Sequence, residues 1–361
     1  MRRLSPLLIC VSALGLAASL PIGATPSAAV SAAAAAKPCP RGSVPAVIRG
    51  SRRCLRPGLR CFRRDDRRYH RYGFHCHSGR LTRRRPPASR PGVTVMAAGD
   101  IACEPGDTVT ATRCHQRQTS NLLDDPKVDA VLTLGDNQYE DGRYSEFTGR
   151  QTYADTWGRK KAITRPAPGN HEYHISGADG YFDYFGAAAG ARGKGYYSFN
   201  LGSWHLIALN SEISASAGSA QERWLRSDLG ATAKKCILAY WHKPRFSSGG
   251  HGSTTSVSAL WQALYRAHAD VVLTAHDHDY ERFALQGPSG QANASGIREF
   301  VVGTGGASHS SFSSKIEPNS QIRNASTYGV LKLSLHSGSY EWKFVPEAGG
   351  TFTDSGATQC H

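Results

Sequence analysis

The stretch LTLGDNQYED, residues 132–141, decides how the chain is interpreted, because an apolar run stops there at an acidic residue. Asp136 closes the run, and Tyr139 follows three residues later. A polar turn after a strand explains Asp136 on its own, since Gly and Asp favour turns. The alternative is that Asp136 and Tyr139 both direct oxygens at a metal ion. The other strands of the chain decide between these two interpretations.

Short aliphatic runs of the same kind recur from residue 93 onward. They are GVTVMAAGD (92–100), VDAVLTLGD (128–136), SWHLIALNSE (203–212), KKCILAYWH (234–242) and ADVVLTAHDH (269–278). Each run is predicted to be a buried strand. Helical patterns lie between them: SAQERWLRSDL (219–229) opens with a capping-box pattern, and SVSALWQALYRAHA (256–269) spaces its apolar residues three and four apart. Strands alternating with helices predict an α/β domain.

Several of these strands end on side chains that bind hard or borderline metal ions. The donors are Asp100, Asp136, Asn170, His242, His276 and His278. In α/β sheets, ligands collect beyond the carboxyl ends of the strands, so donors far apart in sequence converge there. A single Gly-Asp turn or strand-end histidine is usually structural. Donors at so many strand ends together predict a metal site.

The ordered set of motifs resembles the calcineurin-like metallophosphoesterases. The motifs are GD (99–100), GDNQY (135–139), GNHE (169–172), WH (241–242) and AHDH (275–278). GDNQY with its tyrosine, and AHDHDYER (275–282), resemble the purple acid phosphatase branch in particular. The resemblance spans residues 93–345. It implies a four-layer α/β/β/α sandwich and a centre that holds two metal ions.

The resemblance also implies which side chains hold each ion. The first ion would take Asp100, Asp136, Tyr139 and His278, and the second would take Asp136, Asn170, His242 and His276. A phenolate suits Fe(III), whereas neutral imidazole and amide donors suit divalent Zn, Mn or Fe. The alternative for Tyr139 is an aromatic ring packed over the turn.

Two histidines are candidates for contact with the substrate. His171, next to Asn170, resembles the family histidine that stabilises the transition state or protonates the leaving group; the alternative is a supporting role beside the ligands. His251, in RFSSGGHG (245–252), lies in a loop where the family often carries a substrate-facing histidine, and a surface histidine is the alternative. Glu172 and Arg282 are expected to be structural. The sequence departs from the family at Ala275, where glycine is usual, and at Cys103, in place of a glycine-rich continuation.

The net charge of +15 belongs to one small segment. Residues 37–92 contain Lys37 and sixteen arginines against only Asp65 and Asp66, whereas residues 93–361 carry a net charge of −2. We interpret residues 37–80 as a Cys-rich basic module, 81–92 as an Arg/Pro linker and 93–361 as the metallophosphoesterase domain. Residues 37–92 would suit an anionic polymer at the cell surface. The alternative is an appendage without a specific ligand, and no nucleic-acid-binding motif is evident.

Residues 1–36 have the layout of a secretory signal peptide followed by an Ala-rich lead-in, and no later stretch is apolar enough to span a membrane. Without Cys10, eight cysteines remain, and disulfides are expected in an exported chain. Local grouping would place two bridges within the basic module, one between Cys103 and Cys114, and one between Cys236 and Cys360. The sequence alone leaves the connectivity open.

The function expected from these features is hydrolysis of phosphate monoesters outside the cell, by in-line attack of a metal-activated water or hydroxide. A phosphodiesterase or nucleotide hydrolase on the same metal core is one alternative, because substrate loops rather than the core decide between them. A non-catalytic, surface-attached binding protein is the other.

Overall fold

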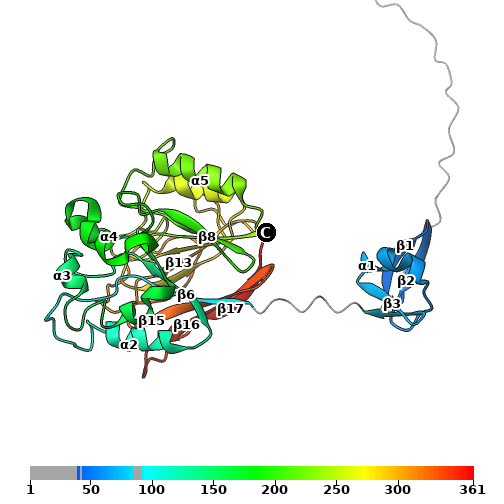
Figure 1. Cartoon of the computed structure of the whole chain (residues 1–361), viewed down its shortest axis with the longest axis horizontal. Coiled ribbons are helices and arrows are strands. Elements are labelled where there is room, and N and C mark those ends of the chain that lie inside the picture. Colours follow the sequence, from blue (N-terminus) through cyan, green and yellow to red (C-terminus); the bar gives the residue numbers. More distant parts are fainter. Residues whose placement is uncertain (1–38, 41–42, 84–91) are drawn as a thin grey trace, which may run out of the picture. The chain divides into compact units, whose positions relative to one another are not determined.

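The computed structural model describes residues 39–40, 43–83 and 92–361. The chain divides into two compact units, one ending at Pro86 and one beginning at Pro87, and each is described by itself (Figure 1). The predicted signal peptide and lead-in, and most of the predicted linker, lie outside the described residues.

The larger unit contains a six-stranded and a seven-stranded sheet. In spatial order the six strands are β17 (Ser355–Gln359), β16 (Ser339–Pro346), β15 (Gly329–Leu335), β5 (Val93–Ala98), β6 (Val128–Leu134) and β7 (Thr164–Ala167). The seven are β14 (Ser320–Asn324), β12 (Tyr280–Phe283), β13 (Arg298–Val302), β11 (Val271–Thr274), β10 (Cys236–Tyr240), β9 (Trp204–Ala208) and β8 (Tyr197–Leu201). Strands β5, β6 and β7 run parallel in the first sheet, as do β9, β10, β11 and β13 in the second. Each of the predicted strands is therefore confirmed.

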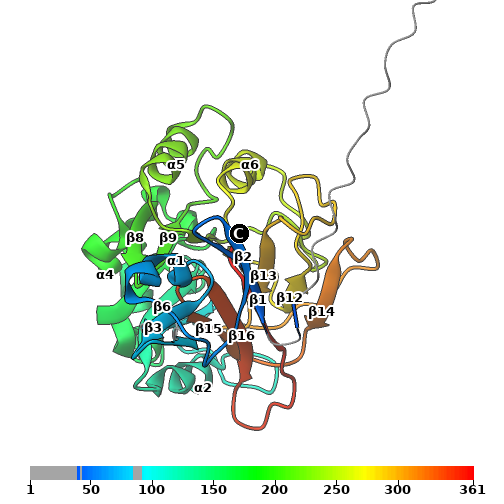
Figure 2. The ribbon, with the colours of Figure 1, turned by 90° about the vertical axis from the view of Figure 1, so that its right-hand side faces the viewer.

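Helices cover both outer faces of the paired sheets. On the seven-stranded sheet, α5 (Ala220–Ala231) and α6 (Ser258–Arg266) pack their apolar faces against β9, β10 and β11. The helices near the other sheet are α2 (Gln116–Asn121), α3 (Tyr144–Phe147) and α4 (Asp179–Phe185). Figure 1 shows α5 and α2 on opposite sides of the sheets, and Figure 2 shows α5 and α6 side by side. The four-layer α/β/β/α sandwich is confirmed, and it explains why β9, β10 and β11 are buried along their whole length.

The predicted cap of α5 forms, although its geometry differs from a full capping box. The Ser219 hydroxyl accepts a hydrogen bond from the backbone N–H of Glu222 at 3.2 Å. The Glu222 carboxylate reaches one residue further than expected and accepts from the N–H of Gly218 at 3.0 Å. Both groups still satisfy backbone donors that the first turn of the helix leaves free.

The two sheets are joined at the edge where their parallel strands end. The backbone N–H of Gly99, after β5, donates to the carbonyl of Val302 at the end of β13 at 2.9 Å. Nδ1 of His242, after β10, donates to the carbonyl of Leu134 at the end of β6, also at 2.9 Å. These bonds bring the carboxyl ends of both sheets to one place.

The described part of the smaller unit contains two hairpins, a 3-10 turn (Arg63–Asp65) and one short α-helix. Its elements are β1 (Val44–Ile48), β2 (Ser51–Leu55), α1 (Asp66–His70), β3 (Phe74–His77) and β4 (Arg80–Arg83). A small apolar cluster that includes Leu55, Tyr69 and Phe74 forms its core. Strand β4 extends to Arg83, beyond the module end expected at residue 80, because Leu81 is buried in that core.

Disulfides form as the local grouping of cysteines predicted. Cys39–Cys54 and Cys61–Cys76 lie in the smaller unit, and Cys103–Cys114 and Cys236–Cys360 lie in the larger one. In the described part of the chain, every helix is too short or too polar to cross a membrane.

Candidate metal centre

Tight turns at the strand ends bring the candidate ligands together. Asp100, Asp136 and His276 adopt left-handed backbone conformations, with φ of 56°, 45° and 72°. Residues other than glycine rarely adopt such backbone angles. The residues that do adopt them cluster at functional sites, where the surrounding structure enforces the conformation.

The phenol of Tyr139 lies at the middle of the first group of donors. Its oxygen is 2.9 Å from Oδ1 of Asp100, 3.3 Å from Oδ2 of Asp136 and 3.0 Å from Nε2 of His278. Tyr139 is therefore more than an aromatic ring packed over the turn, because its oxygen faces the other donors.

His242 lies at the middle of the second group. Its Nε2 is 3.1 Å from Oδ2 of Asp136, 3.1 Å from Oδ1 of Asn170 and 3.1 Å from Nδ1 of His276. The same Asp136 oxygen therefore faces both groups. The structure brings together every residue of the expected ligand set.

Each carboxylate has one oxygen held by the backbone and one oxygen facing the centre. Oδ2 of Asp100 accepts from the N–H of His276, and Oδ1 of Asp136 accepts from the N–H of His171, both at 2.9 Å. The anchored oxygen fixes the orientation of the carboxylate, so the other oxygen is already in place to accept a cation.

The imidazoles are oriented in the same way. Because Nδ1 of His242 donates to a carbonyl, its Nε2 lone pair can face the centre. Nδ1 of His278 lies 2.7 Å from the hydroxyl of Ser308, which leaves its Nε2 beside Tyr139. Such outer hydrogen bonds typically fix the ring and tautomer of a metal-binding histidine.

Close backbone packing surrounds these side chains. A Cβ at Gly169 would lie 2.2 Å from Oδ1 of Asp136, and one at Gly99 would lie 2.5 Å from the methyl group of Ala275. Ala275, which departs from the family pattern, is thus accommodated because the facing residue is glycine.

The charges of the centre are balanced by protons that a metal ion would displace. Burial opposes ionisation of Asp136, but the neighbouring His242 outweighs it and lowers the pKa of the carboxyl. Burial likewise opposes the charged form of His242, yet Asp136 raises the pKa of this imidazole to about 10. Burial and the nearby carboxylates raise the pKa of the Tyr139 phenol, so its phenolate requires a cation against it. Binding of a metal ion would therefore release protons from these residues.

The donor set fits a pair of metal ions. Among the described residues, the ion-pair partners of Asp100 and Asp136 are all histidines, so no lysine or arginine neutralises them. Buried carboxylates are usually paired with a cationic side chain or coordinate a metal. Carboxylate, phenol, amide and imidazole groups around one shared oxygen are donors that suit the second arrangement.

The two candidate substrate-facing histidines both border the centre. Nε2 of His171 is 3.8 Å from Oδ2 of Asp136, and its ring lies 4.3 Å from that of Tyr139. The ring of His251 lies 4.3 Å from that of His276, and its side chain is 54% exposed. His251 therefore lies beside a candidate ligand and open to solvent.

Asp277 lies between two candidate ligands, although no pattern in the sequence marks it as functional. This buried carboxylate accepts from the backbone N–H of His251 at 2.7 Å and from Nδ1 of the same residue at 3.2 Å. It also accepts from the Ser247 hydroxyl at 2.5 Å and from the N–H of Gly252 at 3.2 Å. Asp277 thereby holds the loop that places His251, a contact that no local pattern predicts.

Glu172 and Arg282 have the structural roles expected of them. Glu172 is buried and accepts from the N–H of Asn137 and of Gly169, both at 2.7 Å, so it joins the GDNQY and GNHE loops. Arg282 donates from Nε to Oδ2 of Asp354 at 2.6 Å, away from the ligands.

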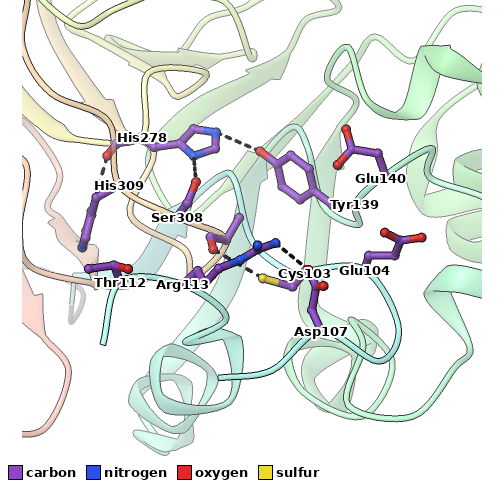
Figure 3. Close-up of a pocket in the computed structure, with 11 residues that line it drawn as sticks. Cys103, Glu104, Asp107, Thr112, Arg113, Tyr139, Glu140, His278, Ser308 and His309 are labelled. Carbon is purple, nitrogen blue, oxygen red and sulfur yellow. Dashed lines mark hydrogen bonds and ion pairs between the residues drawn. The ribbon is translucent and has the colours of Figure 1, made fainter. Parts of the chain in front are cut away.

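A pocket of about 500 Å³ opens on the Tyr139 side of the centre (Figure 3). It is lined by Cys103, Glu104, Asp107, Thr112, Arg113, Tyr139, Glu140, His278, Ala307, Ser308 and His309. In Figure 3, Arg113 reaches toward Asp107, and their ion pair measures 2.6 Å. The loop closed by the Cys103–Cys114 bridge therefore forms one wall of the pocket.

Comparison with known proteins agrees with this arrangement. Residues 93–280 match the family model of the calcineurin-like phosphoesterases, and the chain belongs to that family. Within the family it falls in the branch that resembles purple acid phosphatases, whose fold implies a centre with two metal ions.

Purple acid phosphatase 21 of Arabidopsis thaliana is 27% identical over 296 residues, which cover 74% of this chain and 63% of that protein. Purple acid phosphatase 15 of the same plant is 26% identical over 231 residues, covering 54% and 42%. A purple acid phosphatase from yellow lupin (Lupinus luteus) seeds shares the fold, with a TM-score of 0.59 and 19% identity over 78% of this chain and 55% of that one. The chain thus spans about half of the length of these relatives.

Proposed function

We propose that the protein is an exported phosphomonoesterase of the purple acid phosphatase type, which hydrolyses its substrate by in-line attack of water on phosphorus. The observation that carries the proposal is the position of Asp136, whose Oδ2 lies 3.3 Å from the phenol of Tyr139 and 3.1 Å from Nε2 of His242. One carboxylate oxygen shared by two donor groups is the arrangement that a bridged pair of metal ions requires.

In this proposal the ligands divide between the two ions as the resemblance to the family implies. Asp100, Asp136, Tyr139 and His278 hold one ion, and Asp136, Asn170, His242 and His276 hold the other. The first set suits Fe(III) because of its phenolate, and the second suits divalent Zn, Mn or Fe. When bound, two such ions supply a water of lowered pKa and positive charge for the phosphoryl oxygens.

His171 is the proposed proton donor to the leaving alcohol. Its Nδ1 is 2.6 Å from the carbonyl oxygen of Glu140, which can only accept, so Nδ1 carries a proton. Nε2 is then the atom that faces the centre and that exchanges protons with the substrate. A carboxylate oxygen of Glu140 also lies 3.1 Å from Nδ1, on the side of the ring away from Nε2.

His251 is the proposed contact to the phosphoryl oxygens. The hydrogen bond from its Nδ1 to Asp277 raises the pKa of the imidazole, which favours the cationic form. A cationic ring at the rim of the centre attracts a phosphate dianion and stabilises the charge that spreads over its oxygens during transfer.

The pocket beside Tyr139 is the proposed binding site for the organic group that is esterified to the phosphate. Its volume of about 500 Å³ is within the usual range for small-molecule sites, so it accepts an organic substituent. The same volume keeps a phosphodiesterase or nucleotide hydrolase as the second candidate.

Metal analysis and a small substrate panel test the proposal together. We expect at least two metal ions per chain and faster turnover of p-nitrophenyl phosphate than of bis-p-nitrophenyl phosphate. Faster turnover of the diester would favour the second candidate. Inactivity toward both esters in the metal-loaded protein would favour a surface-attached binding protein.

The identity of the first metal has its own test. Tyrosinate bound to Fe(III) gives a visible charge-transfer band, which we expect in the wild type and not in Tyr139→Phe. A colourless, metal-loaded protein without iron would contradict the assignment of Fe(III).

Attachment of the basic unit to an anionic surface polymer is supported only by its charge.

A further inference from the structure

A second cluster of metal-binding side chains lies in the smaller unit. Asp66 and His70 are one turn apart on α1, and His75 is on the facing strand β3. Side chains four residues apart share one face of a helix, so Asp66 and His70 both face His75. The three side chains come from two elements that the chain folds against one another.

The ligand atoms of this cluster lie close together. Oδ2 of Asp66 is 3.0 Å from Nε2 of His70 and 3.0 Å from Nδ1 of His75. The two imidazole nitrogens are 3.4 Å apart. Each residue thus presents one donor atom to a common point.

These separations match a tetrahedral metal site. With zinc–ligand bonds of about 2.0–2.1 Å, neighbouring ligand atoms of a tetrahedron are about 3.3 Å apart. The candidate metal centre of the larger unit shows the same spacing, since Nε2 of His242 is 3.1 Å from both Asp136 and His276. The two clusters therefore have the same local geometry.

The outer contacts of Asp66 resemble those of a metal ligand. The backbone N–H of Cys76 donates to Oδ1 of Asp66 at 2.6 Å, which leaves Oδ2 to face the imidazoles. The Cys61–Cys76 bridge fixes this backbone position next to His75. One oxygen is anchored and the other is free, as at Asp100 and Asp136.

The ion-pair partners of Asp66 also differ from those of its neighbour Asp65. Arginines predominate in residues 43–83, yet both ion-pair partners of Asp66 in the described structure are histidines. The adjacent Asp65 pairs instead with Arg49 at 2.7 Å and Arg68 at 2.8 Å. With both guanidinium contacts on Asp65, the carboxylate of Asp66 is available to a cation.

We propose that Asp66, His70 and His75 bind a divalent transition-metal ion, with Zn²⁺ as the preferred one. Two imidazoles and one carboxylate form a donor set that zinc sites use, with the remaining position open to water. The side chains are 20%, 32% and 45% exposed, so the site lies at the surface. The ion would join α1 to β3 in a unit whose apolar core is small.

Zinc titration of the full-length protein, purified with its own metals, tests the proposal. We expect calorimetry to show one further equivalent of Zn²⁺ bound by the wild type and not by the His70→Ala/His75→Ala variant. His77→Ala is the matched control, because this exposed histidine follows His75 on the same face of β3 and lies outside the cluster. Equal uptake by the wild type and the double variant, or loss of the ion in His77→Ala, would overturn the assignment.

A second measurement needs no variant and so does not depend on whether one folds. Diethyl pyrocarbonate modifies accessible imidazoles, and peptide mass spectrometry locates the modified residues. Added Zn²⁺ should reduce modification of His70 and His75 at least tenfold and leave His77 unchanged. Identical labelling with and without Zn²⁺ would show that the cluster is held by hydrogen bonds alone. This readout is independent of phosphoesterase activity.

Discussion

The two units of the chain gather the same kinds of side chain around a point, but they hold them differently. In the larger unit, Asp100, Asp136 and His242 are almost fully buried at the ends of strands that large cores support on both faces. In the smaller unit, Asp66 and its histidines lie at the surface over a small core. The difference indicates that burial and outer hydrogen bonds hold the first cluster in place, whereas the second has a small core and the nearby Cys61–Cys76 disulfide to hold it.

The units also differ in charge. The larger unit is close to neutral, and its centre concentrates carboxylates. The smaller unit carries the excess of arginine, and its two acidic residues are both engaged with cationic or imidazole partners. The predictions below test the two units separately.

The largest effect is expected from loss of the shared carboxylate. Asp136→Asn removes a charge that faces both donor groups, and metal-ion stabilisation of a transition state is worth several kcal/mol. We expect kcat/KM to fall on the order of 10³-fold, with metal content below two ions per chain. Asp183→Asn, the same change at an exposed ion pair, is the control and should retain activity. An active, metal-loaded Asp136→Asn protein would contradict the assignment.

The next effect concerns stability of the larger unit. Burial opposes ionisation of Asp354, but hydrogen bonds from Arg282 and Tyr280 outweigh it and lower the pKa of the carboxyl. Asp354→Asn removes the anionic partner of the Arg282 guanidinium and should cost about 3–5 kcal/mol of unfolding free energy at pH 7. Urea denaturation followed by tryptophan fluorescence measures this, since all 6 tryptophans lie in this unit.

The Asp354 carboxyl also determines the direction in which the stability of the larger unit changes with pH. Because the pKa of Asp354 is lowered in the folded state, its contribution is complete above the unfolded value near 4. The contribution is lost as the pH falls through the folded value. In metal-free protein, the difference between the wild type and Asp354→Asn should therefore shrink below about pH 4. A difference that is constant from pH 7 to pH 3 would refute this role for the ionised carboxylate.

In the smaller unit, a comparable loss of stability is expected from removal of a disulfide. The Cys61–Cys76 bridge spans 15 residues, and a loop of that size is worth about 3 kcal/mol in the chain-entropy model. Cys61→Ser/Cys76→Ser should make the arginine-rich unit sensitive to trypsin while tryptophan fluorescence stays native. Unchanged resistance to trypsin would mean that the small core suffices.

A smaller effect is expected at the loop that carries His251. Asp277→Asn weakens the contacts to His251, and loss of a supporting hydrogen bond typically costs 10–100-fold in activity or metal affinity. We expect kcat/KM to fall about tenfold with metal content unchanged. If Asp277 acts through His251, the double variant with His251→Ala should be no worse than His251→Ala alone. Additive losses would assign Asp277 a separate role.

The smallest effect should follow deletion of residues 37–92. All candidate ligands of the metal centre that includes Asp136 lie between Asp100 and His278, in the larger unit. Turnover of p-nitrophenyl phosphate should therefore remain within about twofold of the wild type, a difference of roughly 0.4 kcal/mol. A large loss would show that the basic unit helps to shape the active site.

The features of this molecule that can be predicted from the sequence are those marked by a local sequence pattern. Buried runs such as CILAY at β10 identify strands, and Asp136 and His242 follow the strands directly, so the location of the centre can be predicted. The structure agrees with the pairing hypothesis based on local grouping, although the sequence alone left the connectivity of the cysteines open. The helix at Ser219 is predicted by its cap.

The sequence does not predict contacts between distant segments that no pattern marks. Three such contacts depend on how loops meet after folding. Arg113 lines the pocket, Asp277 accepts hydrogen bonds from the loop of His251, and Asp354 pairs with Arg282. Asp66 and His70 have helical spacing, but His75 joins them only because β3 packs on α1.

Anomalous diffraction from crystals of the metal-loaded, full-length protein tests the central claim most directly. We predict two peaks in the larger unit on either side of the Asp136 carboxylate, each about 2.0–2.3 Å from its ligands. One peak would adjoin Asp100, Tyr139 and His278, and the other would adjoin Asn170, His242 and His276. A map with a single peak, or with no peak beside Asp136, would contradict the account.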